Sequence, residues 1–144
     1  MAYEVEKATI EDLFSINELY KQFPKDMSSN INNMKRLFID KKDNLLLLVV
    51  KENEQVVGTG SAFLFPSLVA DCRPFLVIDN IIIDKYYQHK GLGTMLMNEF
   101  ENYAIVNKCL FTYLIAWSDN SVACDFYKKL GYNDPVTGFQ KTYN

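Results

Sequence analysis

The pattern of apolar and polar residues predicts a mixed α/β fold centred on residues 75–83. In this stretch both alternating sets of side chains are apolar, as expected for a strand covered on both faces. Asp79 and Asn80 interrupt the run and should face a cleft or a specific partner, because burying either one unpaired costs about 1 to 3 kcal/mol. Strict alternation assigns the apolar side chains to two faces: Phe75, Val77, Ile81 and Ile83 on one, and Leu76, Ile78 and Ile82 on the other.

The rest of the chain divides into short elements of both kinds. Further strands are predicted at residues 3–8, 45–51, 55–65, 109–117 and 136–143. The helix between the strands at 75–83 and 109–117 makes a βαβ unit, which favours parallel pairing. Four helices are predicted, with these inner residues: Leu13, Ile16, Leu19 and Tyr20; Ile31, Met34, Leu37 and Phe38; Leu92, Leu96, Phe100, Tyr103 and Ala104; and Val122, Ala123, Phe126, Tyr127 and Leu130.

Short polar segments mark the ends of these elements. Thr9, the run Ser28-Ser29-Asn30 and the cluster at residues 118–121, which includes Asn120, are expected to cap the first, second and fourth helices. Gly131 is the expected left-handed stop of the fourth. A turn at residues 52–54 should join the strands at 45–51 and 55–65 as a hairpin.

A glycine-punctuated turn, Gln88-His89-Lys90-Gly91-Leu92-Gly93, lies between the buried strand and the third helix. A helix N-terminus presents unpaired N–H donors and the positive end of the helix dipole, and glycine lets an anion approach the backbone closely. The turn therefore predicts a site for an anion such as a diphosphate. A tight turn that needs glycine for steric reasons alone is the alternative, and this motif by itself supports both equally.

Two motifs together resemble a known family. The spacing Gln88-x-x-Gly91-x-Gly93, behind a buried strand and ahead of a helix, resembles the acetyl-CoA-binding motif of the GNAT family of N-acetyltransferases. Later in the chain, Trp117-Ser118-Asp119-Asn120 closes a strand, and the helix that follows carries Phe126-Tyr127 and ends in Leu130-Gly131-Tyr132. That arrangement looks like the late helix of the same family, and the two motifs occur in the expected order.

The resemblance implies a fold and an activity. The expected fold is one GNAT domain over residues 1–144, with a central mixed, mostly antiparallel sheet of six to seven strands, flanked by about four helices. That sheet is splayed between its two central parallel strands. The expected activity is transfer of the acetyl group from acetyl-CoA to a primary amine, by direct attack in a ternary complex. A non-catalytic module with the same fold, which binds CoA or dimerises, is the alternative.

The resemblance also assigns roles to residues. The diphosphate of acetyl-CoA is expected at the main-chain N–H groups of the turn, and its pantetheine arm at Asn120 and at the main chain of residues 81–83. Tyr127 is the expected general acid for the leaving thiolate, although packing on the inner face of its helix would explain the same residue. The full set of expected cofactor-binding residues is Ile81, Ile82, Ile83, Gln88, His89, Lys90, Gly91, Leu92, Gly93, Thr94, Asn120 and Tyr127.

The general base is assigned on weaker grounds. Asp79 and Asn80 should point to opposite faces of the strand, so at most one of them lines a given site. We assign the base to Asp79, acting directly or through a water molecule. His89 is the single histidine, and its place in the phosphate turn makes it a bystander to the chemistry. Asp71 and Arg73, in the loop before the strand, are weak candidates for contacts with the acceptor, and ordinary solvated loop charges are the favoured alternative for both.

Composition narrows the partners. A net charge of −3 argues against a nucleic-acid binder, because phosphate backbones are held by clustered basic residues. The chain has no run of about 20 apolar residues, so we expect no membrane contact. Three cysteines without metal-ligand spacing are expected to be reduced and at least half-buried, in a cytoplasmic protein that needs no metal. A dinucleotide-binding oxidoreductase fits poorly, because Leu96 stands where its third glycine belongs. The partner that the family resemblance implies is a small-molecule or peptide amine, and a homodimer is allowed.

Overall fold

The computed structural model describes residues 2–144. The chain forms two compact units, Met1–Tyr113 and Leu114–Asn144. Its elements follow in the order β1 (Tyr3–Lys7), the 3₁₀ helix η1 (Ile10–Asp12), α1 (Leu13–Tyr20), α2 (Ile31–Asp40), β2 (Leu45–Glu52), β3 (Gln55–Phe65), β4 (Phe75–Ile83), α3 (Leu92–Val106), β5 (Thr112–Leu114) and α4 (Ser121–Lys129).

The strands form one sheet in the order β1-β2-β3-β4-β5. The first four strands are antiparallel neighbours. At the start of β4, Leu110 N donates to Pro74 O over 2.8 Å and Leu76 N donates to Phe111 O over 3.2 Å. From the first bond to the second, the residue numbers rise in both segments. The segment leading into β5 therefore runs parallel to β4, and the sheet is mixed, as predicted.

The described chain has five strands, so the prediction of six to seven was too high. Residues 136–143, predicted as a strand, have no regular structure, and Val136 and Phe139 are exposed. The strand predicted at 109–117 is regular only over Thr112–Leu114, and the side chains of Ile115 and Trp117 are exposed rather than doubly buried. Alternating apolar residues form a strand only where a neighbouring chain accepts their main-chain hydrogen bonds.

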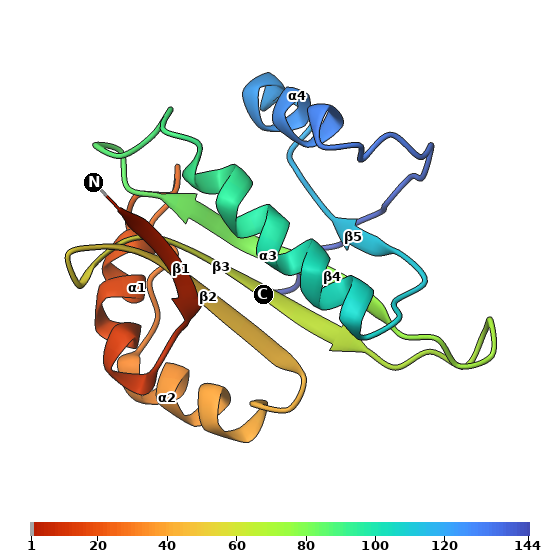
Figure 1. Cartoon of the computed structure of the whole chain (residues 1–144), viewed down its shortest axis with the longest axis horizontal. Helices are drawn as coiled ribbons and strands as arrows, with labels where there is room; N and C mark the ends of the chain where they lie inside the picture. Colours follow the sequence, from red (N-terminus) through yellow and green to blue (C-terminus); the bar gives the residue numbers. More distant parts are fainter. Residues whose placement is uncertain (1) are drawn as a thin grey trace. The chain divides into compact units, whose positions relative to one another are not determined.

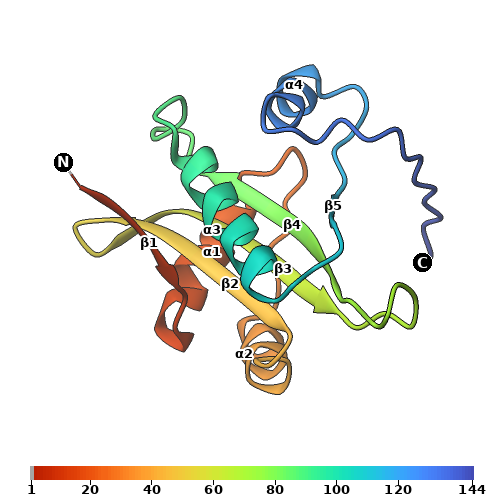
Figure 2. The same cartoon turned by 45° about the vertical axis from the view of Figure 1, so that its right-hand side comes forward.

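Helices cover both faces of the sheet in the first unit. The helix α3 lies across one face, and α1 and α2 lie on the other (Figure 1 and Figure 2). On the α3 face, Leu96, Met97 and Phe100 are fully buried. On the α1 face, Leu13 and Ile16 pack with strand residues in a continuous apolar cluster. The apolar stripes predicted for these two helices therefore make the core.

The helix α2 is attached more loosely than predicted. Asn30 caps its N-terminus, with Oδ1 accepting from Asn32 N over 2.9 Å, as the sequence indicated. Ile31, Met34 and Phe38 pack against the apolar cluster, but no residue of α2 is buried. Leu37 was expected to face inward and is 50% exposed, so that assignment was wrong.

A β-bulge interrupts the pairing of β3 with β4. Thr59 pairs with Ile82 and Ser61 pairs with Asp79, so Gly60 stands opposite two residues, Asn80 and Ile81. Asn80 has a φ of 55°, in the left-handed region that side chains rarely adopt. The extra residue shifts the alternation of side chains by one position.

The bulge makes the predicted face assignment of residues 75–83 wrong. Ile83 pairs with Gly58, and a Cβ built on Gly60 would lie 3.0 Å from both Ile81 and Phe100 of α3. Ile81 and Ile83 therefore face α3. The residues that share the α1 face are instead Phe75, Val77, Asp79 and Ile82, whose partners on β3 are Phe65, Phe63, Ser61 and Thr59.

The second unit contains α4. Asn120 caps this helix, with Oδ1 accepting from Ala123 N over 3.1 Å. Gly131 follows the helix with a φ of 99°, which confirms the predicted left-handed stop. Val122, expected to face inward, is 73% exposed.

Candidate functional site

The turn between β4 and α3 adopts a conformation that requires glycine at one position. Gly91 is the N-cap of α3 and has a φ of 80°, a region that L side chains enter only at a cost. A Cβ built on Gly91 would meet no atom within 4 Å. The positive φ therefore explains why glycine is required here, and steric crowding of a side chain does not. The space where a side chain would lie is open.

The N-terminus of α3 presents main-chain donors beside that space. The first helical hydrogen bond runs from Met95 N to Gly91 O over 3.1 Å, so the N–H groups of Leu92, Gly93 and Thr94 precede it. Within residues 2–144, no side chain caps this helix. The preceding residues Gln88, His89 and Lys90 are exposed. A 15-residue helix with open terminal amides attracts an anion through both its donors and its dipole.

The side chains of the turn have local partners. Gln88 Nε2 donates to Ile83 O over 3.2 Å, which ties the turn to the end of β4. The Lys90 ammonium lies 6.0 Å from the centre of the Tyr87 ring. His89 has a φ of 62°, so it belongs to the bent part of the turn. Of these residues, Lys90 brings a cationic charge to the amide-lined turn.

Asp79 lies on the α1 face of β4, before the bulge. Its side chain is exposed, and Oδ1 accepts from Asn80 N over 2.8 Å. The half-buried Tyr20, at the end of α1, is nearby. Burial and, to a smaller degree, the negative charge of Asp79 raise the pKa of Tyr20 to about 12. The phenol of Tyr20 is therefore protonated at neutral pH and can donate a hydrogen bond beside Asp79.

Sequence reasoning did not place Tyr20 near Asp79. The helical pattern placed it correctly on the inner face of the first helix, and it packs against the apolar cluster there. Its nearness to Asp79 comes from the docking of α1 against β4, two elements about 60 residues apart in the chain. A phenol at the last position of an otherwise apolar helix stripe was the one available signal.

The residues expected to act at the thioester end fall in both units. Residues 81–83 belong to β4, where Ile82 is buried and the other two are half-buried. Asn120 and Tyr127 belong to α4 in the second unit, at its N-cap and two residues before its end. The Tyr127 ring contacts Phe126 and Tyr132 edge-on, with centroids 5.1 and 6.3 Å away.

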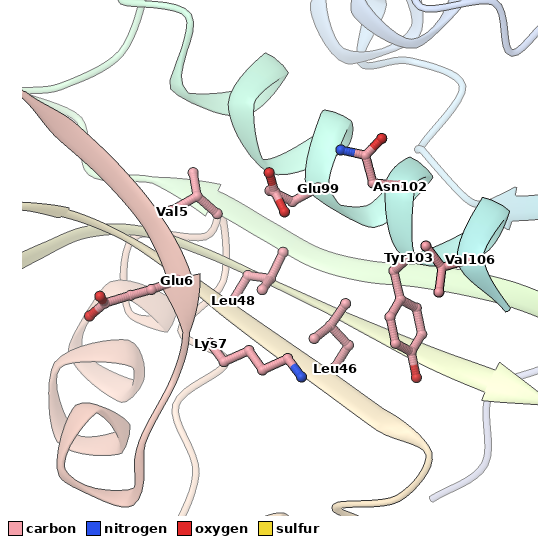
Figure 3. A pocket seen from close by; sticks show the side chains of 9 residues that line it. All are labelled: Val5, Glu6, Lys7, Leu46, Leu48, Glu99, Asn102, Tyr103 and Val106. Atoms are coloured by element: carbon pink, nitrogen blue, oxygen red, sulfur yellow. The ribbon is translucent and has the colours of Figure 1, made fainter.

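A groove of about 340 Å³ lies elsewhere, between the β1–β2 edge of the sheet and α3 (Figure 3). Leu46 and Leu48 line it from β2, and Glu99 and Tyr103 line it from α3. None of its nine lining residues is a predicted site residue. The groove is therefore separate from the turn and from Asp79.

The loop residues and cysteines differ from expectation in part. Arg73 donates to Lys108 O and Cys109 O, over 3.2 and 2.8 Å, so its guanidinium joins two segments of the first unit. Cys72 is exposed, contrary to the prediction of buried or half-buried thiols, while Cys109 and Cys124 are half-buried. Across residues 2–144, no helix is long and apolar enough to cross a membrane.

Comparison with known proteins identifies the family and the fold. Over 79 residues the chain is 35% identical to a Bacillus subtilis subsp. natto protein named "Probable spermine N(1)-acetyltransferase", a match covering 54% of this chain and 52% of that protein. The matched region thus spans about half the length of that relative. Two solved structures share the fold at low identity. Glucosamine-6-phosphate N-acetyltransferase from Arabidopsis thaliana has a TM-score of 0.86 at 20% identity, with 100% of both chains covered.

The second structure is an aminoglycoside acetyltransferase from an uncultured soil metagenomic sample, solved with trehalose. Its TM-score is 0.83 at 16% identity, with 99% of this chain and 97% of that one covered. The model of the Acetyltransferase (GNAT) family matches residues 10–132, which include the whole of β4, the glycine turn and both later helices. The chain therefore belongs to the GNAT acetyltransferase family.

Proposed function

We propose that this protein is an N-acetyltransferase that moves the acetyl group of acetyl-CoA to a primary amine within a ternary complex. The observation that carries the proposal is the open N-terminus of α3, where Gly91 leaves space above three main-chain donors. Family membership supports acetyl-CoA as the donor. The acceptor is a small-molecule or peptide amine, and the relatives named above act, by their names, on such amines.

The diphosphate of acetyl-CoA binds the N–H groups between His89 and Thr94 in this proposal. Amides at a helix N-terminus suit two negatively charged phosphates, and the hydroxyl of Thr94 adds one further donor. Lys90 contributes positive charge at the same turn. Gln88 supports the turn through its bond to Ile83 O.

The pantetheine arm is proposed to lie along the main chain of residues 81–83. The nine-residue β4 is much longer than its three-residue neighbour β5, so β5 pairs with only part of it. The main chain beyond the bulge is then available to an extended ligand. The amide of Ile81 would polarise the thioester carbonyl, a contribution of about 2.7 to 4 kcal/mol where such a donor is well placed. Asn120 would hold the arm by a hydrogen bond.

The chemistry follows from the groups assigned to it. The acceptor nitrogen attacks the thioester carbon, the carbon–sulfur bond breaks, and the sulfur leaves as a thiolate. Tyr127 protonates that thiolate, since a phenol with an ordinary pKa of about 10 holds its proton at neutral pH. Asp79 accepts the proton of the amine, directly or through water. The Tyr20 phenol lies within electrostatic range of the Asp79 carboxylate, whose Oδ1 is oriented by the N–H of Asn80.

Release of free thiol from acetyl-CoA tests this assignment. We expect Tyr127→Phe to lower kcat by about 10²- to 10⁴-fold while leaving the acetyl-CoA dissociation constant near the wild-type value. Tyr132→Phe removes a hydroxyl from the adjacent ring and serves as the matched control, with kcat within twofold of wild type. Equal kcat values for both variants and the wild type would exclude Tyr127 as the acid.

An acceptor screen tests the substrate class. The panel contains spermine, glucosamine 6-phosphate, an aminoglycoside and a peptide with a free N-terminus, each at saturating acetyl-CoA. We expect at least one amine to release thiol in proportion to acetylated product. Acetyl-CoA binding by calorimetry without turnover on any amine would favour the non-catalytic module over the enzyme.

A further inference from the structure

We propose that Gln22 and Asp84 form a clamp on the segment between β4 and α3, residues 84–91, here called the diphosphate turn. The clamp holds this turn in the conformation that binds the diphosphate. Gln22 lies two residues beyond α1, and Asp84 is the first residue after β4. Gln22 Nε2 donates to Asp84 Oδ2 over 3.0 Å, and Gln22 Oε1 accepts from Lys85 N over 2.9 Å. One amide side chain thus uses both its donor and its acceptor on consecutive residues of the turn.

Asp84 is the centre of this arrangement. Its other carboxylate oxygen accepts from Tyr86 N over 2.9 Å, and its carbonyl accepts from Tyr87 N over 2.8 Å. Its own N–H donates to Val57 O over 2.8 Å, which anchors it to β3. Main-chain bonds to β3, bonds within residues 84–87 and the bonds of Gln22 therefore all hold this segment. Among the bonds described, Gln22 supplies the side chain that reaches it from the loop after α1.

The clamp joins the two halves of the proposed site. Tyr20 is the last residue of α1, and Gln22 lies two residues beyond it. Tyr20 is near Asp79, and Gln22 is hydrogen-bonded to Asp84 at the start of the turn. The end of α1 therefore follows β4 from the proposed base to the diphosphate turn. Gln22 acts here as a positioning residue, because it contacts Asp84 and Lys85 and not the reacting atoms.

The clamp can be tested by swapping the amide and the carboxylate between positions 22 and 84. Gln22→Glu places two carboxylates against each other. Asp84→Asn removes one acceptor, so whichever way the two amides turn, an NH₂ group faces another donor: Gln22 Nε2, Lys85 N or Tyr86 N. In the double variant Gln22→Glu/Asp84→Asn, the amide of Asn donates to the carboxylate of Glu, and Lys85 N keeps its acceptor. The double variant also has the net charge of the wild type.

This inference rests on the proposed acetyl-CoA site, and calorimetric titration with acetyl-CoA is its assay. We expect each single variant to raise the dissociation constant about tenfold, because only the fraction of molecules with a formed turn binds. The double variant should return to within about twofold of wild type. In steady-state assays the KM for acetyl-CoA should rise in the single variants while kcat stays near the wild-type value.

Two features separate the clamp from simpler explanations. Removing the negative charge of Asp84 should tighten diphosphate binding if charge alone mattered, whereas the clamp predicts that Asp84→Asn weakens it. Asn17 is the matched control, because its side chain holds the loop after α1 through two 2.8 Å bonds to Ser29 and does not reach the turn. Asn17→Asp should leave the dissociation constant within twofold of wild type.

Amide hydrogen exchange at Lys85 gives a second readout that needs no ligand. The amide of Lys85 should exchange its hydrogen faster in Gln22→Ala than in the wild type. In the double variant Gln22→Glu/Asp84→Asn the exchange rate should return to the wild-type value. If the wild-type protein does not bind acetyl-CoA, the proposed function is wrong. The clamp is then tested by hydrogen exchange at Lys85 alone. Additive losses in the double variant, or unchanged exchange and affinity in the single variants, would overturn the clamp.

Discussion

Gly91→Ala separates backbone strain from ligand contact at the turn. Gly91 has a φ of 80°, and an added Cβ would meet no atom within 4 Å. The cost to folding is then that of placing alanine in the left-handed region, about 1 to 2 kcal/mol. For a chain of this size that free energy corresponds to a fall in Tm of about 2 to 8 °C. The variant should therefore remain folded at assay temperature.

The cost to cofactor binding should be larger. In the proposed complex the diphosphate occupies the open space above Gly91, so a methyl group there displaces it from at least one main-chain donor. A hydrogen bond to a charged group contributes about 1.5 to 3 kcal/mol. Losing one raises the acetyl-CoA dissociation constant by about tenfold to a hundredfold. Calorimetric titration measures that constant, and thermal melting measures the folding cost on the same sample.

Gly131→Ala is the matched control for this experiment. Gly131 has a φ of 99° and likewise has no atom within 4 Å of an added Cβ. It follows the C-terminus of α4, where no anion is expected, so the variant should show a similar fall in Tm without the loss of affinity. If Gly91→Ala binds acetyl-CoA within twofold of wild type while its Tm falls as expected, the main-chain diphosphate site at this turn is refuted.

Two further predictions concern the scaffold. Gly60→Ala should cost about 1 to 3 kcal/mol in urea unfolding, because its Cβ would lie 3.0 Å from a fully buried aromatic ring of α3; Gly138→Ala, in open space, is its control and should be nearly neutral. Lys51→Met should cost about 3 kcal/mol, because the buried carboxylate of Asp12 loses its cation at 3.1 Å. The hydrogen bond with Glu6 chiefly raises the pKa of Lys51, so this stabilisation is complete below pH about 10.5 and is lost as pH rises through the higher folded-state value. If the free energies of unfolding of the wild type and Lys51→Met differ by the same amount at neutral and at strongly alkaline pH, the ion-pair explanation is wrong.

Local patterns predicted most of the elements. Helix caps at Thr9, Asn30 and Asn120, the hairpin of β2 and β3, and the helix after the glycine turn were all read from a few neighbouring residues. Capping and turn chemistry act within about four residues, so a sequence window contains the whole cause. The same holds for Gly131, whose left-handed conformation follows from its place after a helix.

Strand alternation failed at the bulge because its cause is not local. An inserted residue in one strand is defined only by the partner strand, and here the partner is Gly60 on β3. Two consecutive polar residues, Asp79 and Asn80, in an apolar run were the visible signal, and they were interpreted as opposite-facing rather than as a bulge. The consequence was that Ile81 and Ile83 were assigned to the wrong face.

Contacts between distant segments account for the remaining site residues. Gln22 and Asp84 are separated by 62 positions, and nothing in the polar segment around Gln22 distinguishes a clamp from an ordinary loop. The helical pattern correctly placed Tyr20 on the inner face of its helix. It did not indicate that Tyr20 lies near Asp79. Side-chain hydrogen bonds of this kind depend on how α1 docks against β4, and that docking is decided by the whole core.

The bulge explains how one strand can serve both the core and the site. Without it, Asp79 and residues 81 and 83 would share a face, and burying that face would bury the carboxylate with the isoleucines. The extra residue at Asn80 lets Ile81 and Ile83 face α3 while Asp79 lies on the opposite face of β4, near Tyr20. Asn80 holds a φ of 55° in mid-strand, where the chain does not reverse, and its N–H bonds the Asp79 carboxylate. Strain of about 1 to 3 kcal/mol at such a residue persists only where the surrounding structure enforces it. The apolar residues after the bulge anchor the start of the diphosphate turn, and the acidic residue before it remains accessible to an amine.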